Sequence, residues 1–357
     1  MKAAVISLGS TSSLMVVEAL EKYFEQVDII QLRDIEMSLG RNSSLLYQGN
    51  SLPDYDCIYP KGSFRYAHLL QSIVSKLKKT TPYIPFAPHT FSVAHNKLLT
   101  HLVMQQHDIP QPITYVSPNS DSAKNLLRRV NYPIVMKFPE GTQGKGVMFA
   151  DSYSSASSLL DALGALNQPF IIQEFIETGG TDIRALVVGD RVVASMRRTA
   201  TTEEKRANLH AGGTGEYYDL DRVGRKIAID TAKALNADIC GVDILDGPMG
   251  PQVIEANVSP GLQGLAQISS LDVADEIARF LYKKTKSVVH KDNKVEAAGI
   301  MNNISLENNN QIISNLSFRG ERILLPEMIT KLTLFDESKE YSIKAGKGKL
   351  EIEEFKL

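Results

Sequence analysis

The chain has no tryptophan and only two cysteines, Cys57 and Cys240, among its 357 residues. Two cysteines are too few for the disulfide framework of a small secreted domain, and each lies in an apolar stretch that is typical of a buried thiol. The seven histidines show no spacing typical of a structural zinc site. The sequence therefore speaks against both a disulfide scaffold and a zinc-stabilised fold.

Long apolar runs and an excess of one charge are also lacking. No run approaches the roughly 20 residues of a membrane-spanning helix. The start, MKAAVISLGSTSS, has no basic region followed by an apolar core, so we expect no secretory signal and a cytoplasmic protein. The 39 basic and 41 acidic residues give a formal net charge of -2, and no long Lys/Arg run appears. We therefore expect neither a membrane nor a directly bound nucleic acid as partner.

The composition is that of a folded chain, with 43% hydrophobic and 22% charged residues, and the length predicts two or three domains. Residues 1–90 alternate between short apolar strands and amphipathic helices, which predicts a small parallel α/β module. Gly9 follows the first strand without the glycine pattern of a dinucleotide site. We expect this module to be a scaffold that could also hold substrate.

Proline, glycine and polar residues mark the predicted boundaries. A Pro-rich stretch at 81–90 ends the first module, and a polar, Asn-rich stretch precedes several short strand-like pieces near the end. The predicted divisions are 1–90, 91–170, 171–286, a polar linker at 287–310 and a small β module at 311–357. The predicted helices include 10–23, 67–79, 93–106, 120–130, 154–166, 221–235 and 271–284. The final module carries no residue pattern that indicates a function.

The stretch GVDILDGPMGPQVIEANVSPG predicts a β-hairpin, because two apolar strands flank a Gly/Pro turn. With the turn centred on Pro248, Asp243 lies across from Val253, and Asp243, Glu255 and Asn257 share one face. Two carboxylates and an amide oxygen among apolar residues are ligands suited to Mg²⁺. The same pattern also fits a half-solvated sheet with a polar outer face.

A glycine-rich loop, EGTQGKG, follows a predicted strand that carries Lys137. It reads GKG and opens a strand, whereas a Walker loop reads GK[ST] and opens a helix. Gly141, Gly144 and Gly146 let backbone N–H groups approach an anion, and Lys145 adds charge. The loop could close over phosphates as a lid, although an ordinary glycine-rich hairpin would look the same.

Charged residues are frequent in QEFIETGGTDIRALVVGDRVVASMRRTA and in KRANLHAGG. A Gly-Asp turn joins two strands, and Asp182 and Arg184 share a face of the first while Arg198 lies near the end of the second. Arg206 and Asn208 lie in the polar loop beyond them. Arginine and asparagine suit planar carboxylate or phosphate groups, although single residues of this kind are usually solvated.

The ordered motifs MKFPEGTQGKGV, QEFIETGGTDIRALVVGDRVVA, RANLHAGG, GVDIL and IEANVSPGLQG resemble those of the RimK-type ATP-grasp ligases, which transfer L-glutamate onto a carboxylate. The resemblance covers roughly residues 91–282. It implies an α/β (α+β) protein in which an ATP-grasp fold follows a Rossmann-like α/β domain and precedes a small β-rich C-terminal appendage. Two departures are Phe175, where an aromatic hydroxyl is common, and Ala211, where relatives often have Arg.

The resemblance also implies roles for individual residues. The implied nucleotide contacts are Lys97, Lys137, Gly141, Gly144, Lys145, Gly146, Glu174, Phe175, Ile176, Asp182, Arg206 and Asn208. The residues implied near the phosphates and the acyl substrate are Arg184, Arg198, Arg206 and Asn208. The implied metal ligands are Asp243, Glu255 and Asn257, holding two Mg²⁺ ions, with Mn²⁺ as an alternative metal.

The reaction implied by the resemblance is ATP-dependent formation of an amide through an acyl phosphate, with L-glutamate as the amine. The acceptor carboxylate would belong to a protein C-terminus or to a glutamyl-tailed cofactor, and the enzyme would be a homodimer or homotetramer. Three alternatives stay open: another amino acid as amine, a carrier protein as acceptor, and an ATP-sensing binding module without turnover. A full set of metal ligands speaks against the last, since an idle site does not need one.

Overall fold

The computed structural model describes residues 1–41, 43–141, 146–200, 214–304, 317–319, 322–325, 329, 333, 335–336 and 339–355, with backbone only for 291–304, 317–319, 322 and 324. The chain forms two compact units, Met1–Lys294 and Val295–Leu357. Within the described residues, every helix is too short or too polar to cross a lipid bilayer.

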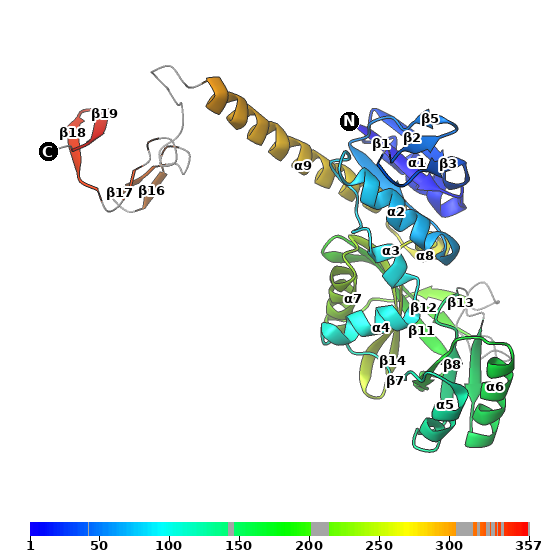
Figure 1. Ribbon diagram of the computed structural model, residues 1–357. Helices are drawn as coiled ribbons and strands as arrows, with labels where there is room; N and C mark the ends of the chain where they lie inside the picture. Colours follow the sequence, from blue (N-terminus) through cyan, green and yellow to red (C-terminus); the bar gives the residue numbers. More distant parts are fainter. Residues whose placement is uncertain are drawn as a thin grey trace. The chain divides into compact units, whose positions relative to one another are not determined.

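An N-terminal α/β module opens the larger unit (Figure 1). Its central strand, β1, pairs in parallel with β2 on one side and with β6 on the other. The apolar run AAVI is buried on both faces of β1, as is typical of a central parallel strand. The elements are β1 (Lys2–Ser7), α1 (Thr11–Leu20), β2 (Gln26–Gln31), η1 (Leu32–Asp34), β6 (Cys57–Pro60), η2 (Phe64–Tyr66) and α2 (Ala67–Leu77). The strands and helices predicted here are confirmed.

A small antiparallel sheet within this module was not predicted. It consists of β3 (Ile35–Met37), β4 (Leu45–Tyr47) and β5 (Asn50–Ser51) in that order. The strands have only two or three residues each, too few to display the alternation of apolar and polar residues by which a strand is predicted.

The helix predicted at 93–106 is divided into α3 (Thr90–Ala94) and α4 (Lys97–Gln106). Asn96 interrupts it, because its backbone is extended and its side chain accepts a hydrogen bond from the N–H of Leu99. The break makes Lys97 the first residue of α4, and its N–H donates to the carbonyl of Pro139 at 2.8 Å. Lys97 is thereby held beside the glycine-rich loop.

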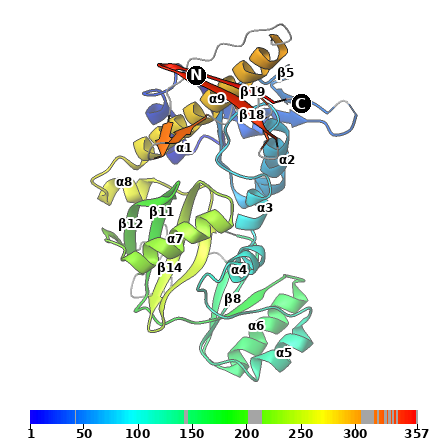
Figure 2. The ribbon, with the colours of Figure 1, turned by 90° about the vertical axis from the view of Figure 1, so that its left-hand side faces the viewer.

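A four-stranded antiparallel sheet with the order β7-β10-β8-β9 follows. Helices α5 and α6 lie side by side against it and share its apolar core (Figures 1 and 2). The elements are β7 (Thr114–Tyr115), α5 (Ser120–Leu127), β8 (Ile134–Lys137), β9 (Val147–Ala150), α6 (Tyr153–Ala165) and β10 (Ile171–Glu174). Since β10 pairs with β7 and β8, this sheet extends past the predicted boundary at residue 170.

A five-stranded antiparallel sheet with the order β13-β12-β11-β14-β15 completes the larger unit. Helix α7 packs against it, and its core is continuous with that of the N-terminal module (Figure 2). The elements are β11 (Thr181–Val188), β12 (Arg191–Thr199), β13 (Thr214–Tyr217), α7 (Arg222–Ala234), β14 (Ile239–Gly247), β15 (Gly250–Asn257) and α8 (Gln263–Ile268). Because the core is shared, the N-terminal module is fixed relative to this sheet.

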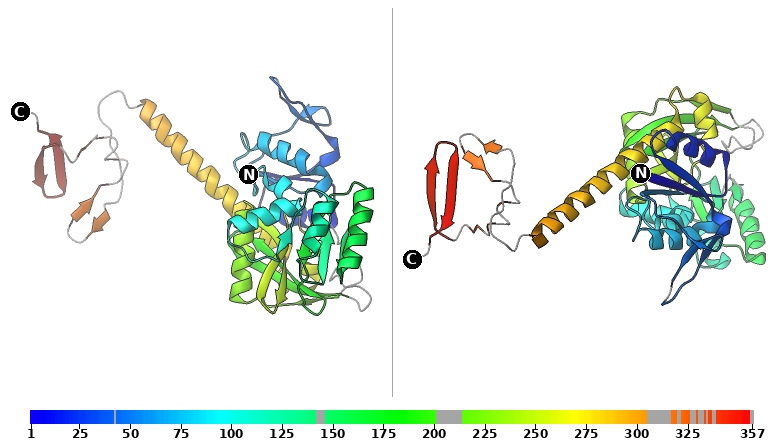
Figure 3. Two further views of the ribbon diagram at one scale, coloured as in Figure 1. Left: turned by 60° about the horizontal axis from the view of Figure 1, so that its bottom comes forward. Right: turned by 90° about the horizontal axis from the view of Figure 1, so that it is seen from above.

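The predicted polar linker at 287–310 begins inside a helix. Helix α9 (Val273–Ile304) continues 20 residues past the predicted end at 284 and is drawn as one unbroken helix in Figure 3. The C-terminal unit contains two antiparallel hairpins, β16 (Ser317–Arg319) with β17 (Arg322–Leu324) and β18 (Tyr341–Gly346) with β19 (Lys349–Glu354). The β character predicted for 311–357 is confirmed for these four strands.

Candidate functional site

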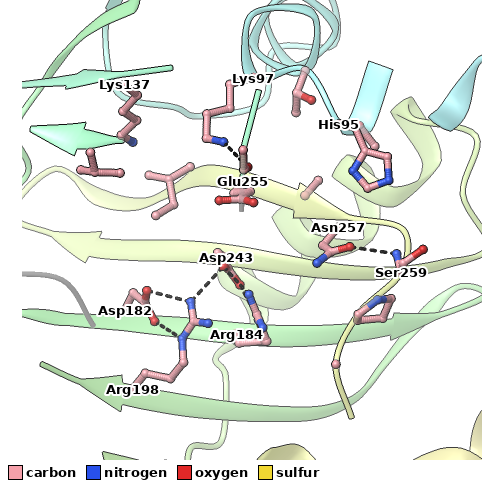
Figure 4. A pocket seen from close by; sticks show the side chains of 18 of the residues that line it. His95, Lys97, Lys137, Asp182, Arg184, Arg198, Asp243, Glu255, Asn257 and Ser259 are labelled. Carbon is pink, nitrogen blue, oxygen red and sulfur yellow. Dashed lines mark hydrogen bonds and ion pairs between the residues drawn. The ribbon is translucent and has the colours of Figure 1, made fainter. Parts of the chain in front are cut away.

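A cleft of about 570 Å³ is lined by both large sheets and by the N-terminal module. Every predicted site residue that the structure describes lines this cleft: Lys97, Lys137, Gly141, Gly146, Glu174, Phe175, Ile176, Asp182, Arg184, Arg198, Asp243, Glu255 and Asn257. Figure 4 labels the charged members of this set except Glu174. Gly144, Lys145, Arg206 and Asn208 lie outside the described residues.

The three predicted metal ligands come together on the β14–β15 hairpin by a route that differs from the predicted one. The two-residue tip gives the pairing Ile244↔Val253, and a β-bulge then shifts the register so that Asp243 pairs with Glu255. If the register continued without the bulge, Asp243 would pair with Ile254, and Glu255 would face away from the cleft. The predicted register, Asp243 across from Val253, is therefore wrong, while the predicted shared face is confirmed.

Cross-strand pairs place further charges on the same face. Arg184 on β11 pairs with Asp243 on β14, and Asp182 on β11 pairs with Arg198 on β12. The Arg184 guanidinium donates from Nε and Nη2 to the two oxygens of Asp243 at 2.8 and 2.7 Å. Arg198 donates to both oxygens of Asp182 at 2.5 and 2.7 Å, and its Nη2 lies 2.9 Å from Oδ2 of Asp243. The four side chains form one continuous ionic network.

Three of the four residues in this network are buried. None of the three is more than 8% exposed: Asp182, Arg198 and Asp243. Burial alone would raise the pKa of Asp243, but the guanidinium groups of Arg184 and Arg198 outweigh it and hold that pKa well below its usual range. Asp243 therefore stays ionised at neutral pH.

Lys137 approaches the cleft from β8 in the other sheet and lies opposite Glu255 (Figure 4). Its ammonium donates to Oε1 of Gln173 at 2.6 Å, and Nε2 of Gln173 contacts the His101 ring at 3.1 Å and donates to Thr114 at 2.8 Å. This buried polar chain fixes the position of the Lys137 side chain. Burial lowers the pKa of Lys137 to about 8, with Glu255 opposing the shift.

One end of the cleft is apolar and suits a flat ring. Val135, Phe149 and Leu245 line it, and the Phe149 and Phe175 rings meet edge to face with centroids 5.8 Å apart. Ile176 lies just after β10, and its backbone N–H has no hydrogen-bond partner among the described residues. An adenine base could accept from that N–H while its ring packs on the apolar walls.

The ends of the glycine-rich loop are fixed on both sides. The Lys97 ammonium donates to the carbonyl of Gly141 at 2.9 Å, and the N–H of Phe138 donates to the carbonyl of Gly146. Gly146 has a φ of +79°, and a Cβ there would lie 2.2 Å from the Phe138 ring. Only glycine fits this position, so the loop leaves and re-enters its sheet at defined points.

The donor set at Asp243, Glu255 and Asn257 fits a hard cation. Glu255 has no hydrogen-bond or ion-pair partner within the described part of the chain, and Asn257 Oδ1 accepts one bond, from the N–H of Ser259 at 2.8 Å. Asp243 is shared with the two arginines. The described residues contain no group of three His, Cys, Asp or Glu that could hold a metal alone. This agrees with a Mg²⁺ that takes several ligands from phosphates.

The sequence did not single out three further residues that line the cleft: Lys61, His95 and Ser259. Lys61 directly follows the buried strand β6, and a lysine at the carboxyl end of a parallel strand was the available signal. Ser259 lies in the motif IEANVSPGLQG, where the carboxylate and amide drew the prediction, and His95 lies in none of the motifs given above. Figure 4 shows both at the end of the view that also contains Asn257.

Comparison with known proteins identifies related sequences over most of the chain. A family model described as the RimK-like ATP-grasp domain matches residues 94–281. The "Probable alpha-L-glutamate ligase 2" of Pseudoalteromonas atlantica is 36% identical over 293 residues, which cover 80% of this chain and 97% of that protein.

Solved structures with the same fold are more distant in sequence. A RimK domain ATP-grasp protein from Sphaerobacter thermophilus has a TM-score of 0.61 at 19% identity and covers 78% of this chain and 99% of its own. The ATP-grasp ligase PsnB, solved with a minimal precursor, Mg and ADP, has a TM-score of 0.63 at 16% identity and covers 80% and 97%. These likenesses confirm the predicted ATP-grasp architecture.

Proposed function

The chain belongs to the RimK-like ATP-grasp family, and we propose that it joins the amine of L-glutamate to a substrate carboxylate while ATP is converted to ADP and phosphate. The relative from Pseudoalteromonas atlantica is named as a probable alpha-L-glutamate ligase, which supports glutamate as the amine. A protein C-terminus or a glutamyl-tailed cofactor would supply the carboxylate. PsnB was also solved with a precursor peptide, which supports a peptide over a cofactor as acceptor.

One observation carries the proposal. The bulge at Ile254 turns Glu255 toward the cleft beside Asp243, and Lys137 faces them from the opposite sheet. Cationic and anionic groups on opposing walls are what a phosphate chain with a divalent cation requires. A site that only packed the two sheets together would have no need for a Glu255 carboxylate that lacks a partner in the described part of the chain.

The proposed reaction has two steps. An oxygen of the acceptor carboxylate attacks the γ-phosphorus of ATP, and the bond to the leaving oxygen breaks to give an acyl phosphate and ADP. The glutamate amine then attacks the acyl carbon, phosphate leaves, and the nitrogen loses a proton to give an amide. Neither step requires a nucleophilic side chain, so the protein contributes by holding the reactants together and by stabilising charge.

Each wall of the cleft has a role in this scheme. The apolar end with Ile176 would hold adenine, and Lys97 and Lys137 would contact the phosphates. Asp243, Glu255 and Asn257 would hold Mg²⁺, which neutralises phosphate charge when bound; we propose two such ions, with Mn²⁺ as a substitute. The glycine-rich loop would limit the access of water to the acyl phosphate.

The direct test follows ADP release from Mg²⁺-ATP with a panel of amino acids, with and without peptides that end in glutamate, and identifies products by mass. Turnover that depends on L-glutamate and adds glutamyl masses to the peptide is the expected result. Turnover with a different amino acid would replace glutamate as the amine. ATP binding without ADP release on any acceptor would favour a sensor over a ligase.

Lys137 provides a separate prediction for nucleotide binding. Lys137→Met should weaken ADP binding about 10- to 100-fold, the range of one or two charge-assisted hydrogen bonds. Because the pKa of Lys137 is lowered to about 8, its ammonium is lost as the pH rises through 8. Without metal, wild-type affinity should fall about tenfold between pH 7 and pH 9, and the variant should lose this dependence. Calorimetric titration measures both effects.

The matched control is Lys283→Met, since Lys283 is exposed on α9 and has no described partner. It should bind ADP as the wild type does and keep the same pH profile. An unchanged pH profile in Lys137→Met would show that another group titrates, and Lys137 would then have no contact with the phosphates.

A further inference from the structure

We propose that the crevice at the carboxyl ends of β1 and β6 binds a carboxylate group of one of the two substrates to be joined, with the Lys61 ammonium as its counter-ion. This inference rests on the proposed ligase function and adds a substrate site in the N-terminal module. The ligand is defined by its chemistry as a carboxylate, carried either by the free amino acid or by the acceptor.

Sheet topology marks this crevice as a binding position. The order β2-β1-β6 places β1 in the middle, so the chain leaves β1 toward one side and later returns on the other. In open α/β sheets, ligands bind outside the carboxyl ends of the strands at such a reversal. β1 ends at Ser7 and β6 at Pro60, and Ser7 and Lys61 line the cleft. The N–H of Lys61 donates to the carbonyl of Ile6 at 2.7 Å, which fixes its backbone there.

Lys61 is a buried cation with no counter-charge among the residues that the structure describes. The residue is only 4% exposed, its Nζ donates to the carbonyl of Pro260 at 3.3 Å, and it lies 5.4 Å from the centroid of the Tyr59 ring. No aspartate or glutamate in the described ranges pairs with it. An ammonium has three donors, and burying it beside neutral groups alone costs free energy. An anion that enters the cleft would relieve this cost.

A serine hydroxyl beside Lys61 offers a further hydrogen bond to such an anion. The Ser259 hydroxyl accepts from the N–H of Gly62 at 3.0 Å, which leaves its own proton available. A carboxylate accepts such bonds from several donors at once.

The Lys61 crevice does not lie at the apolar end of the cleft that we assign to adenine. Gly247, at the tip end of β14, lies against Ile176 of the apolar end, since a Cβ at Gly247 would be 2.5 Å from that side chain. At the other end of β14, Gly241 pairs with Asn257 and lies against Pro260, the partner of Lys61. The two glycines are six residue steps apart on the strand, about 20 Å at about 3.3 Å per step. The Lys61 crevice therefore lies beyond Asp243 and Asn257, where a reacting substrate is needed.

The test measures binding of two probes to protein loaded with ADP and Mg²⁺, free L-glutamate and a short peptide with a C-terminal glutamate. Lys61→Met should weaken binding of one probe about 10- to 100-fold, with ADP affinity changed less than about twofold. Lys61→Arg should restore most of the loss. The probe that is affected identifies the source of the carboxylate.

The unfolding temperature of Lys61→Met distinguishes a substrate-binding role of Lys61 from a packing role. If Lys61 binds substrate, Lys61→Met should unfold at the same temperature as the wild type or higher, because an unpaired buried charge has been removed. Lys76→Met is the control, since Lys76 lies on α2 and donates to the carbonyl and the hydroxyl of Ser43 at 2.7 Å, outside the cleft. It should bind both probes normally.

Two results would overturn the inference. One is equal binding of both probes by Lys61→Met and wild type; the other is a wild-type protein that binds ADP and neither carboxylate. Failure of the ligase function itself would appear differently, as no ATP turnover with any acceptor. Probe binding can be measured in that case too, and it still decides whether Lys61 holds a carboxylate.

Discussion

Glu255→Gln should lower ligase turnover at least about 100-fold while leaving the folded protein intact. The side chain keeps its size and loses only its charge, and it has no described ion pair whose loss would cost stability. Loss of one well-placed stabiliser of charge typically lowers turnover by about 100- to 1000-fold. Steady-state ADP release and a thermal melt on the same sample measure the two quantities.

The control for this variant is Glu36→Gln, at an exposed position on β3. It should match the wild type in both turnover and melting temperature. Normal turnover in Glu255→Gln would remove Glu255 from the metal site and, with it, the observation that carries the proposed function.

Asp243→Asn should behave differently, with a large loss of stability in addition to the loss of turnover. Removing the charge leaves the guanidinium groups of Arg184 and Arg198 with one carboxylate, Asp182, between them. Breaking a buried ion pair on one side typically costs about 3–5 kcal/mol of unfolding free energy. Urea denaturation should show this loss, and Asp246→Asn, at an exposed position on the same strand, should not.

The difference in unfolding free energy between the wild type and Asp243→Asn should depend on pH, and the direction follows from the pKa of Asp243. The pKa of Asp243 is lowered by the arginines, so the unfolded chain takes up the proton first as the pH falls. The stability that Asp243 contributes is therefore complete above pH about 4 and declines below it. The wild type and Asp243→Asn should converge in stability as the pH falls below 4. A constant difference down to pH 2 would mean that the carboxylate charge is not what stabilises the fold.

Periodicity and turn residues were sufficient to predict most of the elements. The apolar run of β1, the Gly-Asp turn between β11 and β12 and the Gly/Pro turn between β14 and β15 each have a local cause that is visible in the sequence. The break at Asn96 was not predicted, because a single asparagine within an apolar helical pattern does not by itself end a helix, although it is a preferred N-cap residue. Its N-cap role depends on the backbone turning toward Pro139, which is a tertiary contact.

The predicted site residues that the structure describes all line one cleft, but their ion-pair partners could not be predicted from the sequence. The pairing of Arg184 with Asp243 depends on the register between β11 and β14, and the sequence contains no turn that fixes this register. Arg184 was expected near the phosphates because of a family resemblance, and the structure places its guanidinium on a carboxylate. Lys61 was missed for a related reason. Its significance lies in being buried with no acidic partner among the described residues, which composition does not reveal.

The bulge at Ile254 limits how this hairpin can vary in length during evolution. One residue gained or lost in either paired arm, between Asp243 and Gly247 or between Gly250 and Glu255, exchanges the faces of all residues beyond it. The same change at the tip, where Met249 is 90% exposed, alters only the loop. Insertions and deletions that preserve activity are therefore confined to two positions at the tip, unless a second change creates or removes a bulge.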